Sequence, residues 1–308
     1  MKKQVQARRP ATSLYAEVTD RIIAELEAGR LPWVQPWGDT GADVGMPSNA
    51  GTGRRYSGVN VLTLWVAVMR GGYSSQRWLT YRQAQALGGN VRKGEIGTTV
   101  CYADRFTPKD QSEGDGQGEE ARQIAFLKRF TVFNVDQCEG LGPDLVAMPA
   151  PLAEDQIVPV ADDLIAASGV DFRVGGLEAF YVPSEDLVVV PPRRAYFDEI
   201  NAYRTWLHEL VHATGHASRL GRDLTNPFGS PAYAREELIA EMGSAFLCAS
   251  LGIVPTVRHA DYIGAWLEVL REDSRAIFRA ASAASKAADW LLERHASACR
   301  EFAQEEAA

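Results

Sequence analysis

The decapeptide LHELVHATGH at residues 207–216 contains three of the chain's five histidines together with one glutamate. In a helix, positions i and i+4 lie one above the other on the same face, so His208 and His212 can offer two imidazole nitrogens to one ion. Glu209 lies between them in the H-E-x-x-H spacing, in which the glutamate is the general base of a hydrolytic zinc site. The pattern predicts a metal centre on this helix, with Glu209 as its catalytic residue.

The third metal ligand has to come from another part of the chain, because a catalytic zinc site usually takes three protein ligands and keeps a fourth position open. The segment 233–252 places Glu237 and Glu241 one helical turn apart among apolar residues, where carboxylates need a partner. It resembles the second helix of the glutamate zincins. That resemblance implies Glu237 as the ligand and Glu241 as a carboxylate that steadies a ligand histidine. The reverse assignment stays open, and Glu236 is expected to be a solvated neighbour.

Two further roles at the site have candidates in the sequence. His216 is an alternative metal ligand, which would reach the ion only if the helix broke at Gly215; the extended motif would need a histidine where the chain has Ser218. A hydrolase also needs a donor that stabilises the developing oxyanion. Tyr181 and Tyr233 are the candidates for that donor.

The ligand types favour a particular metal and reaction. Two imidazoles and a carboxylate favour Zn²⁺, although another divalent transition metal would also fit. Peptide hydrolysis is the default reaction of such a site. A nuclease is less consistent with it, because nuclease centres are usually rich in carboxylates and hold Mg²⁺. We therefore predict a zinc metallopeptidase whose protein substrate the sequence does not identify.

Composition and charge describe a two-part globular protein. The 308 residues are 46% hydrophobic and 23% charged, which is typical of a folded chain of about two domains. Residues 1–135 carry an excess of 5 positive charges and residues 136–308 an excess of 13 negative charges, so the two parts are expected to meet different partners. The sequence shows no apolar membrane span or signal segment, and its four cysteines form no pair. We expect a cytoplasmic protein with no membrane contact.

The hydrophobic pattern predicts an α+β protein of two domains, the second mostly helical. We expect a flexible tail at 1–12, a first domain at 13–138, a linker at 139–156 and a second domain at 157–308. The polar segment 107–122 is expected to be a mobile hairpin loop or a disordered insertion. The predicted helices are 14–28, 61–70, 78–89, 160–168, 198–215, 233–251 and segments within 259–305, and the predicted strands are 98–106, 123–135, 179–182 and 186–190.

Aromatic and basic residues alternate through the first domain. Stacking surfaces beside cations suit single-stranded nucleic acid, because every base has a π-face and every phosphate a charge. Some of the aromatic side chains must instead form the core, and Trp65, Phe130 and Phe133 are expected there. The predicted DNA-binding residues are Trp33, Trp37, Arg54, Arg55, Tyr56, Asn60, Arg77, Trp78, Tyr81, Arg82, Arg92 and Lys93.

Several separate motifs together resemble the ArdC family of plasmid antirestriction proteins. This resemblance covers about residues 13–255 and implies an N-terminal domain that binds single-stranded DNA, a C-terminal zincin-like metallopeptidase domain, and protection of incoming plasmid DNA from host restriction. A similar N-terminal domain occurs in plasmid primases. The motifs are RRYSGVNVLTLW, SSQRWLTYRQAQALGGNVRKGEIGTTV, FTVFNVDQCEGL, AFYVPSEDLVVVPPRRAYFDEINAYRTWLHELVHATGHASRLGR and EELIAEMGSAFLCASLGI.

The sequence is consistent with two alternative functions. In the first, the protein binds single-stranded DNA and hydrolyses a protein target, for which a component of a restriction system is a candidate. In the alternative, the protein protects DNA by coating it, and the metal site is structural and not hydrolytic. The H-E-x-x-H spacing favours the first.

Overall fold

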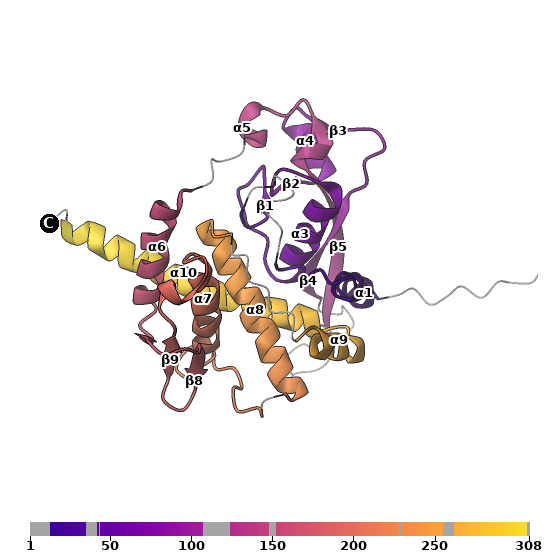
Figure 1. The fold of residues 1–308 in the computed structure, drawn as a ribbon. Coiled ribbons are helices and arrows are strands. Elements are labelled where there is room, and N and C mark those ends of the chain that lie inside the picture. Colours follow the sequence, from indigo (N-terminus) through magenta and orange to yellow (C-terminus); the bar gives the residue numbers. More distant parts are fainter. Residues whose placement is uncertain are drawn as a thin grey trace, which may run out of the picture.

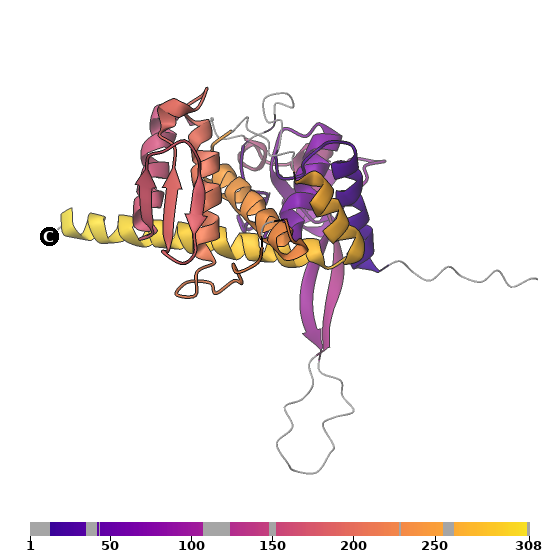
Figure 2. The same cartoon turned by 60° about the horizontal axis from the view of Figure 1, so that its bottom comes forward.

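The computed structural model of the protein describes residues 13–34, 42, 44–106, 124–147, 152–227, 229–254 and 262–306. It is an α+β structure, as predicted, with an N-terminal and a C-terminal half side by side (Figure 1). The long helix α10 (Ala276–Glu306) runs along both halves, and its C-terminal end projects beyond them (Figure 2). The predicted tail at 1–12 and loop at 107–122 lie outside the described residues.

The N-terminal half is a four-stranded sheet with helices packed against it. The strands run in the order β1-β2-β5-β4, with β1 and β2 parallel and the other pairs antiparallel. The β4–β5 hairpin extends well beyond the body of the molecule (Figure 2). The elements of this half are α1 (Leu14–Glu27), β1 (Ser48–Asn49), α3 (Val59–Gly71), β2 (Arg77–Leu79), α4 (Tyr81–Ala86), β3 (Asn90–Val91), β4 (Thr98–Phe106), β5 (Ile124–Asn134), β6 (Cys138–Glu139) and α5 (Pro143–Val146).

The segment 78–89, predicted to be one helix, divides at Thr80. Trp78 and Leu79 belong to β2 and are fully buried, because β2 lies between β1 and β5 in the sheet. Thr80 then caps α4: its hydroxyl accepts a hydrogen bond from the N–H of Gln83, and the Gln83 side chain accepts one from the N–H of Thr80. This reciprocal cap starts the helix three residues later than predicted.

The C-terminal half combines a small sheet with long helices. Its strands run in the order β7-β9-β8. Strand β7 was not predicted: its four residues, DFRV, do alternate between polar and apolar, but the run is short and mostly exposed. Helix α6 starts inside the predicted linker and has Pro159 within it. The elements are α6 (Glu154–Ala167), β7 (Asp171–Val174), β8 (Phe180–Val182), β9 (Leu187–Val190), α7 (Asn201–Thr214), α8 (Pro231–Leu251), α9 (Ile263–Glu272) and α10.

One hydrophobic core joins the two halves. The Trp65 ring of α3 packs edge-on against Phe246 of α8 at a centroid distance of 5.6 Å. Trp33 and Trp266 form a second edge-on pair across the boundary, at a centroid distance of 5.3 Å. Two hydrogen bonds also cross the boundary: Thr19 donates to a backbone carbonyl before α10, and the N–H of Gly58 donates to Ser285 at 2.8 Å. A smaller cluster around Leu79, Ala84, Val91 and Val135 belongs to the N-terminal half alone. The boundaries 13–138 and 157–308 remain a prediction.

None of the described helices is both long enough and apolar enough to cross a membrane. The longest of them, α10, instead packs a face of small residues against the rest of the C-terminal half, with Ala281, Ala284 and Ala287 fully buried. Short side chains let α10 approach its neighbours closely, so its opposite face is fixed in position relative to both halves.

Because the two halves share a core, we expect them to unfold together. Phe246→Ala removes a fully buried ring that contacts Trp65 and should lower the free energy of unfolding by about 3–5 kcal/mol. Calorimetry should show one transition, moved to lower temperature. Phe302→Ala, on the exposed end of α10, is the matched control and should leave the transition in place. Two transitions of which only one moves would contradict a shared core.

Candidate metal centre

The two histidines of the motif are placed by the close packing of α7 against α8. Leu207, Leu210 and Val211 of α7 are fully buried. Opposite them, α8 has Gly243, where an added Cβ would lie 2.9 Å from both γ-carbons of Val211. The missing side chain lets the two helices approach closely, and this brings the imidazoles of one helix to the carboxylates of the other.

The predicted ligands converge on one point. The Nε2 atoms of His208 and His212 are 3.2 Å apart. One oxygen of Glu237 lies 3.5 Å from Nε2 of His208, and the other lies 3.4 Å from Nε2 of His212. Ligands about 2.0–2.1 Å from a tetrahedral zinc ion are roughly 3.3 Å from one another. The three spacings therefore fit a divalent metal, and within the described ranges these are the three residues that form such a cluster.

A second carboxylate lies behind each imidazole. Nδ1 of His212 is 3.1 Å from Glu236, and Nδ1 of His208 is 3.5 Å from Glu241. Carboxylates in this position fix the ring orientation and the tautomer of a ligand histidine. The geometry places Glu237 among the ligand atoms and Glu241 behind a histidine. The expectation that Glu236 is solvated was wrong, because its side chain is only 11% exposed and holds His212.

Two arginines anchor these supporting carboxylates, and neither was predicted. Arg204 of α7 forms a buried ion pair with Glu241, in which both side chains are 2% exposed. Arg222, after α7, binds Glu236 at 2.8 Å and donates to the backbone carbonyl of Val211 at 2.7 Å. Arg204 is four residues before His208 on the same face of α7, which is the signal that could have identified it.

The charges of this cluster are strongly coupled. Burial acts to lower the pKa of both imidazoles, but hydrogen bonds to the carboxylates outweigh burial and raise the pKa of His208 to about 10 and that of His212 to about 9. Burial acts to raise the pKa of Glu237, yet its contacts with the two histidines lower it below its usual range. The site thus favours positive charge, which protons on the imidazoles or a divalent cation can supply.

The alternative ligand His216 is held away from this cluster. Helix α7 ends at Thr214, and Nδ1 of His216 lies 2.8 Å from the Ser218 hydroxyl and 3.7 Å from Asp186. Asp186, which has a φ of 52°, is itself bound by the guanidinium of Arg219. This network keeps the His216 ring on the side of the β8–β9 turn.

The two candidate oxyanion donors differ in what they contact. The Tyr181 hydroxyl donates to Asp186 at 2.8 Å, and burial together with this bond raises its pKa to about 12. Tyr233 is on α8, one turn before Glu237. Burial, a hydrogen bond to Tyr262 and the charge of Glu237 together raise its pKa. Of the two candidates, Tyr233 is therefore the one that borders the metal cluster.

Glu209 is next to the ligand cluster and partly exposed. It follows His208 on α7, and its charge acts on both His208 and Tyr196. A carboxylate that is open to solvent and adjacent to a metal ligand can exchange protons with bound water or substrate. The position agrees with the role that the motif predicts for this residue.

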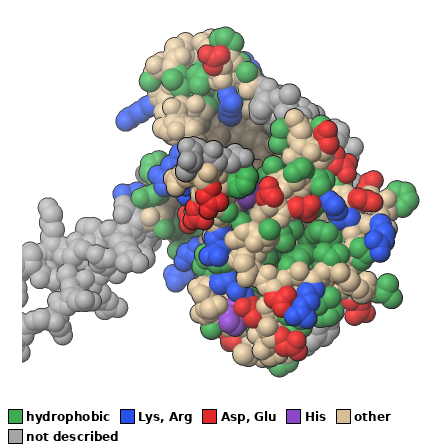
Figure 3. Space-filling view, turned by 90° about the vertical axis from the view of Figure 1, so that its left-hand side faces the viewer, with side chains coloured by type: hydrophobic (Ala, Val, Ile, Leu, Met, Phe, Trp, Pro, Cys, Tyr) green, Lys and Arg blue, Asp and Glu red, His purple; other side chains and the backbone are tan. Residues whose placement is uncertain are grey.

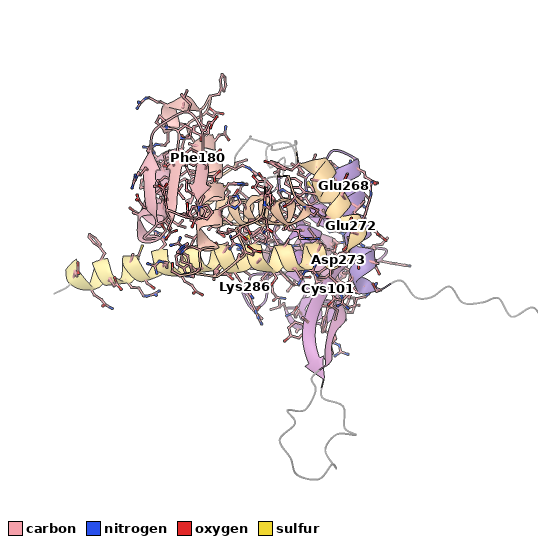
Figure 4. The ribbon with its side chains drawn as sticks, turned by 90° about the horizontal axis from the view of Figure 1, so that it is seen from below. Cys101, Phe180, Glu268, Glu272, Asp273 and Lys286 are labelled. Atoms are coloured by element: carbon pink, nitrogen blue, oxygen red, sulfur yellow. The ribbon has the colours of Figure 1, made fainter. Side chains whose placement is uncertain are left out.

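Four of the predicted DNA-binding residues line a groove of about 1340 Å³ between the two halves. We call this the central groove. From the N-terminal half it is lined by α1, the segment 49–60 and the β4–β5 hairpin, and from the C-terminal half by Leu220, Arg222 and α10. Figure 4 labels Cys101 on β4 and Lys286 on α10, which lie on its two sides. The four residues are Arg54, Arg55, Tyr56 and Asn60.

Two of the predicted stacking residues belong to the core. Trp33 is 2% exposed and Trp78 is 0% exposed. Their rings pack edge-on against Trp266 and Tyr73, so neither face is open to a base, and the prediction was wrong for both. Trp37 lies outside the described residues.

The three aromatic residues predicted to lie in the core differ in how deeply they are buried. Trp65 is 1% exposed, as predicted. Phe133 is half-buried. Phe130 is 46% exposed and lines the central groove, contrary to the prediction, because it lies where the β4–β5 hairpin leaves the body of the protein.

The remaining predicted DNA-binding residues lie outside the lining of the central groove. Some have other roles: Arg77 donates to a backbone carbonyl of α5 at 2.7 Å, and Arg92 pairs with Glu95 at 2.9 Å. Figure 3 shows the surface hollowed between the part of the molecule that carries α4 and α5 and the C-terminal half. The predicted DNA-binding residues that lie outside the lining of the central groove are Arg77, Tyr81, Arg82, Arg92 and Lys93.

Comparison with known proteins assigns each half to a described type of domain. Residues 12–133 match the model of the N-terminal domain of anti-restriction factor ArdC, and residues 159–283 match that of a zincin-like metallopeptidase. An uncharacterized protein, y4eC of Sinorhizobium fredii, is 42% identical over 94% of both chains. Two Escherichia coli DNA primases named TraC are 40% and 38% identical over 90% and 92% of this chain, which spans only 27% and 20% of their length.

Solved structures give the same result. The crystal structure of metal-free antirestriction protein ArdC from plasmid R388 is 42% identical, has a TM-score of 0.79 and covers 93% of this chain and 99% of its own. Its Mn(II)-bound structure is 40% identical, with a TM-score of 0.76, and covers 92% of this chain and 99% of its own. Two imidazoles and a carboxylate at these spacings suit a divalent transition metal of that kind.

Replacing each carboxylate should identify the metal ligand. We expect Glu237→Gln to lower affinity for Zn²⁺ more than a hundredfold, because a ligand is lost. Glu241→Gln should lower it by roughly 10- to 100-fold, because only the support of a ligand histidine is lost. Competition with a fluorescent zinc chelator measures both affinities, and Glu178→Gln, at an exposed position, is the control. The opposite order would make Glu241 the ligand.

Proposed function

This chain belongs to the ArdC antirestriction family, and from that premise we propose that it binds single-stranded DNA and carries a zinc-dependent peptidase site. On this proposal it protects incoming plasmid DNA from host restriction, in the cytoplasm of the cell that receives the DNA. The observation that supports the peptidase part is the clustering of one ligand atom each from His208, His212 and Glu237 within 4.8 Å of one another, with a carboxylate behind each histidine.

The residues of the site have distinct roles in this proposal. His208, His212 and Glu237 would hold the metal, which as a Lewis acid would polarise a carbonyl and lower the pKa of bound water. Glu209 takes a proton from the attacking water and returns it to the leaving nitrogen. The hydroxyl of Tyr233 stabilises the oxyanion.

The supporting residues keep the ligands in place. Glu241, held by Arg204, orients the ring of His208, and Glu236, held by Arg222, orients the ring of His212. Glu236 is within hydrogen-bonding distance of Nδ1 of His212, and Glu241 lies 3.5 Å from Nδ1 of His208. A carboxylate in either position favours the tautomer with the proton on Nδ1, which leaves Nε2 free to bind the metal.

Glu209→Gln should separate DNA binding from protection. We expect the variant to bind Zn²⁺ and a single-stranded oligonucleotide like the wild type, because Glu209 is neither a ligand nor in the central groove. Protection of transferred plasmid DNA should fall by at least tenfold, since a general base contributes roughly 10²–10⁴-fold to hydrolysis. The measurement is the yield of conjugation into a restricting host. Glu185→Gln, at an exposed turn, is the matched control.

Each other outcome of this test decides against one part of the proposal. If Glu209→Gln protects as well as the wild type, the peptidase role is wrong and the alternative function, coating of the strand, explains protection. If the wild type fails to bind single-stranded DNA, the DNA-binding role is wrong. DNA cleavage that is lost in His208→Ala would make the metal site a nuclease centre.

A further inference from the structure

The central groove is lined by cations from both halves of the protein. Arg54 and Arg55 face it from the N-terminal half, and Arg275, Arg279 and Lys286 face it from the C-terminal half. No aspartate or glutamate is among its described lining residues. The protein as a whole has a net charge of −8, so this surface has the opposite sign to the average and favours a polyanion.

The residues of α10 that line the groove lie on one face of the helix, and Arg275, directly before α10, continues that face. Arg275, Phe278, Arg279, Ser282, Ala283 and Lys286 line the groove, at spacings of three and four residues that place them in one stripe. Arg279 also pairs with Asp273 at the start of the helix. Lys286 is exposed and pairs with no carboxylate in the described part of the chain. The opposite face of α10 is the buried alanine face described above.

Aromatic rings lie next to these charges. Tyr102 of β4 is 54% exposed and Phe130 of β5 is 46% exposed, and the two rings meet edge-on at 6.4 Å. On the other side, Tyr15 of α1 packs edge-on against Phe278 of α10 at 4.7 Å, and the guanidinium of Arg275 lies 4.9 Å from the Tyr15 ring centre. Exposed rings beside cations are the components of a surface that binds single strands by stacking and charge.

The size of the groove favours a polymer over a small molecule. Its volume is about 1340 Å³, whereas sites for small molecules usually enclose about 300–1,000 Å³. It is also bounded by elements that are far apart in the sequence and fixed to each other. The N–H of Gly58 donates to Ser285 of α10 at 2.8 Å, and Arg55 reaches Ser250 of α8 at 3.5 Å. Its walls are therefore set before a ligand binds.

We propose that single-stranded DNA lies along the central groove and that α10, from the peptidase half, supplies phosphate contacts opposite those of Arg54 and Arg55. Tyr102 and Phe130 stack on bases, and the cations of α10 bind the backbone. This inference rests on the proposed DNA-binding function and extends it, because the binding surface is shared by both halves of the protein and not confined to the N-terminal one.

The test compares two charge changes on the same helix. Arg279→Gln/Lys286→Gln removes two cations of the groove, and Arg294→Gln/Arg300→Gln removes two cations of α10 that do not line it. Affinity for a fluorescent 20-nucleotide oligothymidylate is measured by anisotropy over a range of NaCl concentrations. Each phosphate contact contributes about 0.7 to the magnitude of the slope of log K against log [salt]. The slope of the groove variant should therefore be smaller by roughly 1.4. At 0.1 M salt the variant should bind the oligonucleotide roughly 10- to 30-fold more weakly than the wild type. The control should match the wild type.

A separate double variant tests whether the two aromatic rings stack on bases. Tyr102→Ala/Phe130→Ala should weaken binding at least fivefold, with little change in the salt slope, because stacking on aromatic rings contributes about 1–3 kcal/mol per base. Phe302→Ala, an exposed aromatic at the far end of α10, is the control. Thermal unfolding of every variant is recorded, and we expect the wild-type transition temperature because all the changed side chains are exposed.

The outcomes distinguish this inference from the function on which it rests. Wild-type protein that does not bind the oligonucleotide would overturn the proposed DNA-binding function itself. Normal wild-type binding, with the groove variants equal to their controls, would overturn only the placement of the strand. A polyglutamate peptide could bind as tightly as the oligonucleotide and show the same decrease in salt dependence with the groove variant. In that case the groove binds acidic proteins and the inference is wrong.

Discussion

The packing of α8 between α7 and the N-terminal half is the constraint on which both functional regions depend. One face of α8 carries Glu236, Glu237 and Glu241 towards the histidines of α7. Five residues further on, Phe246 contacts the core of the N-terminal half. A helix that is buried on several sides cannot shift towards one partner without losing contact with the other. The spacing of the metal ligands and the relative position of the two halves are therefore set by the same packing.

The charged side chains at the metal centre add up to a charge that a divalent cation neutralises. The carboxylates of residues 209, 236, 237 and 241 bring four negative charges, and the guanidinium groups of residues 204 and 222 bring two positive ones. With neutral imidazoles the cluster has a net charge of two negative units, which one divalent ion neutralises. Leaving a buried charge without a partner is costly, and a buried ion pair is retained where it fixes geometry. The pair of Arg204 with Glu241 has that role, because it holds the carboxylate that faces His208.

The sequence indicated the cluster of His208, His212 and Glu237 and a supporting role for Glu241, but not the role of Glu236, the two arginines or the surface that we assign to DNA. The spacing of His208 and His212 follows from helix geometry alone, which is a local property. Arg222 reaches Glu236 only because the chain turns back after α7, and no local pattern encodes that turn. Exposure is also a tertiary property: Trp78 is buried because β2 is an inner strand, whereas Phe130 is exposed because its hairpin leaves the body of the protein. Composition cannot distinguish these two aromatic residues.

The central groove and the metal centre share Arg222. Its side chain lines the groove, and its guanidinium holds the carboxylate of Glu236 behind His212. The walls of the groove belong to both halves and are joined by hydrogen bonds and by a common core, so a strand that binds there would meet a surface already in place. A preformed surface avoids the ordering cost that weakens binding by mobile segments. A strand held in this groove would therefore lie a single side chain away from the residues that orient the metal ligands.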